Sequence, residues 1–164
     1  MEINDTIIRM IEYSKGNTHD ISHFLKVHSF ARLIGQKECL ATELQLYVEL
    51  AAIVHDIACP LCREKYGNTN GKYQEIEGEK LAYDFLDGLG YNSAVCDRVS
   101  FLVGHHHTFT KVDNVDYQIL LEADFLVNFD EGKMTGDQIL SIRKNVFKTS
   151  TGLALLDSIY LNRV

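Results

Sequence analysis

The segment from residue 42 to residue 58, TELQLYVELAAIVHDIA, constrains the fold more than any other because it is apolar on every side of a helix. Its apolar side chains surround the helix axis: Leu44, Leu46, Tyr47, Val48, Leu50, Ala51, Ala52, Ile53, Val54 and Ile57. A helix of this kind lies in the middle of a bundle, where neighbouring helices cover it. We therefore expect the chain to fold as a helical bundle around this segment.

Helical periodicity also runs through the rest of the chain, whereas strand signals are scarce. We expect an all-α fold of seven or eight helices in a single domain over residues 1–164. The expected helices span residues 2–14, 20–37, 42–58, 75–90, 92–106, 116–130, 135–147 and 150–161. A polar connection over residues 62–75 separates the third from the fourth. In this scheme residues 135–161 only pack against the domain, and the chemistry lies within residues 19–130.

The composition excludes several classes of partner. Lysine and arginine total 16 against 23 aspartates and glutamates, a formal net charge of −7 with no block of like charges. A nucleic acid polymer is therefore not an expected partner. The first residues show no signal-peptide pattern and no apolar run reaches membrane-spanning length, so we expect a cytoplasmic protein with no membrane partner. Four cysteines fit reduced thiols in that compartment.

Two polar residues, His55 and Asp56, stand near the end of the apolar helix, in or beside the core. A buried carboxylate costs several kcal/mol unless something compensates its charge. A divalent cation would provide that compensation. The pair therefore directs attention to other histidines and acids on apolar helix faces.

Two further segments place such a residue on an apolar face. His23 begins a stripe that continues through Val27 with steps of four, three and four residues. Asp124 has apolar residues one helical turn before and after it. Together with His55 and Asp56 they form a mixed nitrogen and oxygen donor set, which suits Mn, Fe, Co, Ni or Zn better than Ca.

Each of these residues alone also has an ordinary structural explanation. A buried histidine is more often a core residue with satisfied hydrogen bonds than a ligand. Asp56 could cap a loop, and Asp124 could pair with an arginine. The order His, His-Asp, Asp along one chain is much more specific than any single member.

A run of three histidines closes the helix expected over residues 92–106. Consecutive helical residues differ by about 100° around the axis, so the three rings cannot all reach one site. The stripe Val99, Leu102 and His106 favours His106. The choice between His105 and His106 stays open.

Four segments in order resemble the HD-domain superfamily of metal-dependent phosphohydrolases. They are HDISHFLKV (19–27), AAIVHDIA (51–58), VGHHHT (103–108) and LEADFLVN (121–128). The first departs slightly from the family pattern, because Lys26 stands where arginine is commoner. The two-letter motif H-D is weak alone, but four segments in this order are specific and span most of the chain.

The resemblance implies an all-α bundle that binds a divalent metal ion through four residues: His23, His55, Asp56 and Asp124. Mg joins the five transition metals as a candidate, and we expect one ion rather than two. The implied activity is a phosphomonoesterase or phosphodiesterase. Its expected substrate is a small-molecule phosphate, with nucleotides foremost.

Roles for individual residues follow from position and chemistry. Asp56 is expected to orient a water or accept its proton, and His105 or His106 to protonate the leaving oxygen. Four cations are tentative substrate contacts: Lys26, Arg63, Lys65 and Lys72. A solvated helix lysine and a solvated loop are the alternative interpretations of these four residues.

Two other functions stay open beside the phosphohydrolase. The same site could serve a non-enzymatic module that binds a nucleotide or metal, or a di-iron oxygenase on the same fold. A homodimer is also left open as a partner arrangement.

Overall fold

The computed structural model describes residues 2–162, and every regular element in that part of the chain is helical. This confirms the all-α fold class. The elements are α1 (Ile3–Tyr13), α2 (Thr18–Lys37), α3 (Thr42–Val54), α4 (Cys59–Tyr66), α5 (Gly71–Gly88), α6 (Ser93–Val103), α7 (Val115–Glu131), α8 (Gly136–Asn145), α9 (Ser150–Leu156) and a π-helical turn, Asp157–Leu161.

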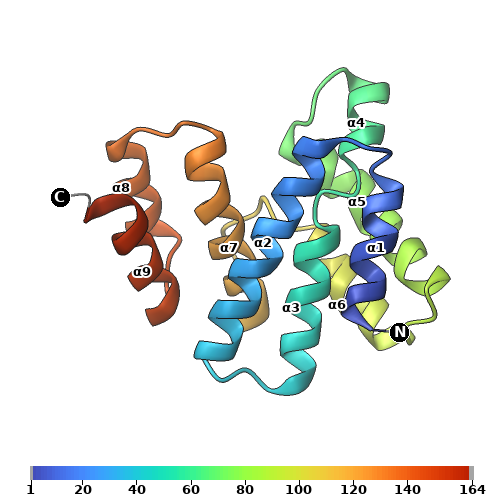
Figure 1. Ribbon diagram of the computed structural model, residues 1–164, viewed down its shortest axis with the longest axis horizontal. Coiled ribbons are helices and arrows are strands. Elements are labelled where there is room, and N and C mark those ends of the chain that lie inside the picture. Colours follow the sequence, from blue (N-terminus) through green and yellow to red (C-terminus); the bar gives the residue numbers. More distant parts are fainter. Residues whose placement is uncertain (1, 163–164) are drawn as a thin grey trace.

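Helix α3 lies inside the bundle, as its composition predicted. It contacts α1, α2, α6 and α7, and its residues 50–54 are completely buried. Figure 1 shows α2, α3 and α7 in the middle of the molecule, with α8 and α9 at one end and α1, α5 and α6 towards the other. A helix covered by neighbours on every side has no face that needs polar residues.

The stretch Thr42–Tyr66 is long and apolar enough to cross a membrane, judged by length and composition alone. This differs from the expectation that no apolar run reaches that length. In the structure the stretch comprises α3, a turn over residues 55–58 and α4, and 67% of its most apolar window is buried inside the protein. Its position as the core of the bundle accounts for its hydropathy.

Helix α4 corrects the expected boundaries around the third helix. That helix ends at Val54 and not at residue 58, and a new helix, α4, takes in the first five residues of the expected polar connection. Pro60 stands in the first turn of α4, where its missing N–H costs nothing. Gly67 ends the helix with a φ of 69°, a conformation that favours glycine. As a result, His55 and Asp56 lie at a sharp turn between two helices.

The histidine run also lies outside a helix. Helix α6 ends at Val103, three residues before the predicted end, and residues 104–107 form a turn. Turn residues do not follow the 100° spacing of a helix, so the argument that separated neighbouring rings does not apply there.

Candidate metal centre

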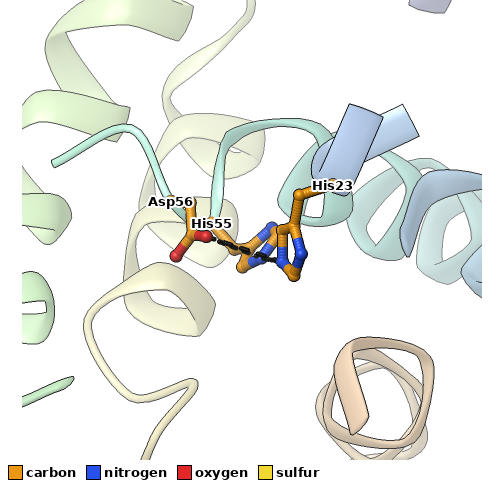
Figure 2. A group of neighbouring side chains, drawn as sticks. All are labelled: His23, His55 and Asp56. Carbon is orange, nitrogen blue, oxygen red and sulfur yellow. Dashed lines mark hydrogen bonds and ion pairs between the residues drawn. The ribbon is translucent and has the colours of Figure 1, made fainter. Parts of the chain in front are cut away.

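Side chains from three separate parts of the fold meet at one point. His23 comes from α2, Asp124 from α7, and His55 and Asp56 from the turn after α3. His23 Nε2 lies 3.1 Å from His55 Nε2, 3.2 Å from Asp124 Oδ1 and 3.5 Å from Asp56 Oδ2. Figure 2 shows the first histidine reaching from its helix towards the His-Asp doublet. These four residues, which the sequence singled out, are called the central cluster below.

The ring nitrogens at this point face one another with their lone pairs. His55 Nδ1 lies 3.0 Å from the Ala52 carbonyl oxygen. A carbonyl oxygen only accepts hydrogen bonds, so this Nδ1 donates, and the neutral ring has its lone pair on Nε2. His23 Nδ1 likewise donates to Glu131 Oε2 at 2.7 Å. Two such Nε2 atoms at 3.1 Å need a proton or a cation between them.

Two further histidines extend the cluster on the other side of Asp56. His106 Nε2 lies 3.6 Å from Asp56 Oδ1. The candidate ligand atoms of Asp56, His106 and His107 all lie within 4.8 Å of one another. The Nε2 atoms of His106 and His107 are both buried, and neither has a hydrogen-bond partner among residues 2–162. We call these two residues the histidine pair.

Residues from α7 and from the backbone orient the ligating groups. Glu131 holds His23 from the side opposite the cluster, and Asn128 Nδ2 donates to Asp124 Oδ1 at 2.8 Å. His106 Nδ1 donates to the Val103 carbonyl at 2.7 Å. Such partners set ring orientation at metal sites. The sequence analysis missed Glu131, although it follows Asp124 by seven residues and so shares its helix face.

The protonation states show how the cluster balances its charge. Burial lowers the pKa of His23, but the hydrogen bond to Asp124 and the charge of Asp56 outweigh it and raise this pKa to about 9. Burial raises the pKa of Asp124, but its hydrogen bond to His23 and the nearby His55 imidazole reverse the effect and lower that pKa well below its usual range. Without a cation, a proton on His23 therefore balances the acids. A cation bound by neutral imidazole would displace that proton.

The residues present fit a divalent cation. They supply imidazole nitrogens and carboxylate oxygens, a set typical of transition-metal sites. Two buried ring nitrogens have no protein partner, which is costly in a folded chain unless a ligand satisfies them. Burial and the charge of His106 together lower the pKa of His107 to about 4, so this ring is neutral and free to coordinate at pH 7.

A cavity of about 280 Å³ lies beside the cluster. His23, Asp56 and Asp124 form part of its wall, so a ligand in the cavity would reach the ligating atoms. The remaining wall is mostly polar: His19, Asp20, Cys59, Arg63, Thr69, Gln74, His107, Asn128, Glu131 and Gly132.

The four basic residues expected to contact the substrate differ in whether they line the cavity. Arg63 lines the cavity, where its guanidinium donates to both carboxylate oxygens of Asp20 at 2.6 and 2.7 Å. Lys26 stays outside the wall and reaches Glu131 Oε1 at 3.1 Å. Lys65 and Lys72 are exposed and do not line the cavity, which corrects their expected placement.

The reason for that correction lies in the α4–α5 connection. Lys65 points to Glu77 on α5, 2.6 Å away, because the two helices pack together. Lys72 follows the first residue of α5, and its backbone N–H donates to the capping side chain of Asn70. Helix formation on both sides of a short turn thus directs these two lysines outwards.

The expectation that His105 could reach the site is also corrected. Its Nδ1 donates to the Phe101 carbonyl at 2.7 Å, and its ring stacks on the Phe101 ring, with centroids 4.2 Å apart. It therefore turns away from the cluster. The turn after α6 instead brings in His106, which the sequence left as one of two choices, and His107, which the sequence did not propose.

A known protein family agrees with this geometry. The HD domain profile matches residues 20–141, a span that contains all four members of the central cluster. The chain belongs to the HD domain family. The resemblance seen in the four sequence segments is thereby confirmed.

A solved structure shares the HD domain fold. It is the crystal structure of a predicted HD superfamily hydrolase from an uncultured Thermotogales bacterium, which matches with a TM-score of 0.65 at 24% sequence identity. The match covers 96% of this chain and 83% of that chain. At this identity the similarity shows a shared fold. No match was found among curated proteins.

Proposed function

We propose that this HD domain protein is a metal-dependent phosphohydrolase that acts on small phosphate esters, with nucleotides as the leading class. The observation that carries the proposal is the convergence of the central cluster and the histidine pair beside one cavity, whose wall includes His23, Asp56, Asp124 and His107. The Thermotogales protein of the same fold is described as a predicted hydrolase, which supports hydrolysis as the chemistry.

Two ligand groups that share Asp56 would hold the metal. The first is the central cluster, and the second joins Asp56 to His106 and His107. We propose two divalent ions, in place of the single ion expected from the sequence, because the second group leaves two buried nitrogens unpaired. Such ions lower the pKa of a bound water and polarise a phosphoryl oxygen.

The chain's own residues supply orientation and charge. Asp56 keeps 25% of its side chain exposed and lines the cavity. Burial raises its pKa, but the nearby imidazoles of His55, His106 and His23 outweigh burial and lower it, so Asp56 stays ionised. An ionised carboxylate here can orient an attacking water by accepting its hydrogen bond. Arg63, on the same wall, offers a planar cation to a phosphate.

One screen tests the proposal. Purified protein is supplied in turn with Mn, Co, Ni, Fe, Mg and Zn. Phosphate release is measured from nucleotides and sugar phosphates, and release of mononucleotides is measured from dinucleotides. Metal analysis of the untreated protein accompanies it. We expect release with at least one metal and its loss in Asp56→Ala, with the helical circular dichroism spectrum kept. Unchanged turnover in Asp56→Ala would remove the mechanism. Tight nucleotide binding without turnover under every metal would indicate a binding module instead.

A further inference from the structure

A glutamine on the cavity wall has an unused hydrogen-bond acceptor. Gln74, in the second turn of α5, is only 6% exposed and lines the cavity. Its Nε2 donates to the Thr69 carbonyl oxygen at 2.8 Å. Its Oε1 is buried and has no hydrogen-bond partner.

The bond to Thr69 fixes which end of the amide is unused. A backbone carbonyl accepts and cannot donate, so the NH₂ group must face Thr69 and the oxygen must face away from it. A buried acceptor without a partner carries the full cost of its lost hydration. Because Gln74 lies on the cavity wall, a donor from outside the chain can remove this cost.

The wall that carries Gln74 is held firmly against the histidine pair. A Cβ added at Gly71 would lie 2.6 Å from Cγ of the His107 ring, so the start of α5 sits directly on that ring. Glu75 Oε1 accepts from the His107 backbone N–H at 3.0 Å and from the Thr108 hydroxyl at 2.9 Å. The first two turns of α5 thus form a wall that is tied to the histidine pair.

The other groups on the wall indicate which part of a ligand would lie there. Among the described residues that line the cavity there is no Phe or Tyr on which a base could stack. The polar uncharged side chains of Thr69, Gln74 and Asn128 are present instead. Hydroxyl groups on a sugar are the donors that such a wall suits best.

We infer that Gln74 Oε1 accepts a hydrogen bond from a sugar hydroxyl of the substrate, so that the cavity selects hydroxylated phosphate esters, namely sugar phosphates and ribonucleotides, over their deoxy counterparts. The inference rests on the proposed function, because it names the substrate class of the same site. A site that pairs a buried polar atom with a substrate hydroxyl rejects an analogue that lacks it.

The experiment compares matched ligands on the metal-loaded protein. Ribose phosphate is paired with deoxyribose phosphate, and AMP with each of its two monodeoxy analogues. Binding is measured by calorimetry and kcat/KM by phosphate release. We expect the wild type to prefer the hydroxylated member of at least one pair by about 5- to 150-fold, the range set by one unpaired buried acceptor.

Variants separate recognition from stability. Gln74→Met, which keeps the length but not the acceptor, should bring the preference close to one. Gln45→Met is the matched control, because Gln45 also has a buried unpaired Oε1 but lies outside the cavity wall. It should keep the full preference even where its stability falls.

Three results would overturn the inference. The first is equal binding of both members of every pair by the wild type, and the second is an unchanged preference in Gln74→Met. The third is a loss of bound metal in Gln74→Met with equal losses on both members, which would assign the amide oxygen to the cation. Discrimination in binding without any phosphate release would keep the inference and reject the proposed hydrolysis.

Discussion

Helix α2 carries two buried histidines five residues apart, and each meets an acid from the α3 segment. His23 belongs to the central cluster with His55 and Asp56. His28 Nε2 lies 3.0 Å from Glu49 Oε2, in what we call the His28–Glu49 pair. Both regions join a histidine of α2 to the α3 segment, and both bury an imidazole beside a carboxylate.

The regions differ in whether the metal-ligating atoms of their histidines and acids are left without a partner. Both carboxylate oxygens of Glu49 have a partner, since Gln45 Nε2 donates to Oε1 at 2.6 Å. Neither His28 nor Glu49 lines the cavity. The central cluster instead combines two facing ring nitrogens with two acids, and the adjoining histidine pair leaves two nitrogens unpaired.

The comparison teaches that a buried His–acid pair is not by itself a sign of metal binding. A closed pair satisfies its own atoms and stabilises the bundle, whereas a surplus of ligating atoms beside a cavity has a use only when something binds. The predictions below test whether this difference separates function from stability.

The largest effect is expected from alanine at the two histidines. His23→Ala should lower kcat/KM by about 1,000-fold and reduce bound metal, because it removes a ligand of the central cluster. His28→Ala should keep metal and kcat but lose about 3 kcal/mol of unfolding free energy, because Glu49 is left charged and buried. Metal analysis, phosphate release and urea unfolding measure the three quantities. Equal activity losses in both variants would erase the distinction.

The next effect concerns the histidine run. His106→Ala should reduce the metal content from two ions to one and lower kcat/KM by roughly 100-fold, the size of one lost electrostatic contribution. His105→Ala is the matched control, because that ring stacks on Phe101 and should leave both quantities unchanged. Metal content per chain is measured together with the rate. Two ions retained in His106→Ala would contradict the shared role of Asp56.

When a chelator has removed the metal, the two regions should make the free energy of unfolding depend on pH in opposite directions. We call the loss at high pH the alkaline limb and the loss at low pH the acidic limb. His23 has its pKa raised from 6.5 to about 9, so its stabilisation is complete below pH 6.5 and is lost as pH rises to about 9. The expected loss is on the order of 3 kcal/mol. Burial raises the pKa of Glu49, but its hydrogen bonds to His28 and Gln45 lower it below 4.5, so its stabilisation is lost as pH falls.

Urea unfolding across pH measures both limbs. His23→Ala should flatten the alkaline limb only, and Glu49→Gln should weaken the acidic limb only. A divalent cation should abolish the alkaline loss, since it displaces the His23 proton. An alkaline limb that persists in His23→Ala would show that another group titrates there.

The smallest effect is expected at Glu131, which influences the metal only by orienting the ligating residue His23. Glu131→Gln should weaken metal affinity by about 10- to 100-fold, because the carboxylate that orients His23 becomes a neutral amide. Asp130→Asn, at an exposed neighbouring acid outside the cavity wall, provides the control. Competition with a fluorescent chelator measures both affinities. Equal weakening in the two variants would indicate a general loss of negative charge.

Much of the fold could be predicted from the sequence. Periodicity is a local property, so it predicted an all-helical chain and the buried position of the helix that contains Leu50. Boundaries were less accurate at two places that matter for function. Pro60 was compatible with a helix start, but the polar residues after it favoured a loop, and the apolar stripe through Leu102 was extended past the true helix end at Val103.

The residues of the candidate site also fall into two groups, those that the sequence predicted and those that it did not. His23, His55 and Asp124 were found because each is a polar residue on an apolar face, and the structure brings them together. Gln74 and Glu131 were missed because a glutamine or glutamate near a helix end is common on ordinary surfaces.

The sequence by itself determined which residues face inwards, because the 3.6-residue repeat of a helix depends only on neighbours along the chain. Only the tertiary structure decided which inward-facing groups meet, since residues as far apart as His23 and Asp124 come together through helix packing that no local pattern encodes. The same packing closed the His28–Glu49 pair and left the central cluster open to a cavity.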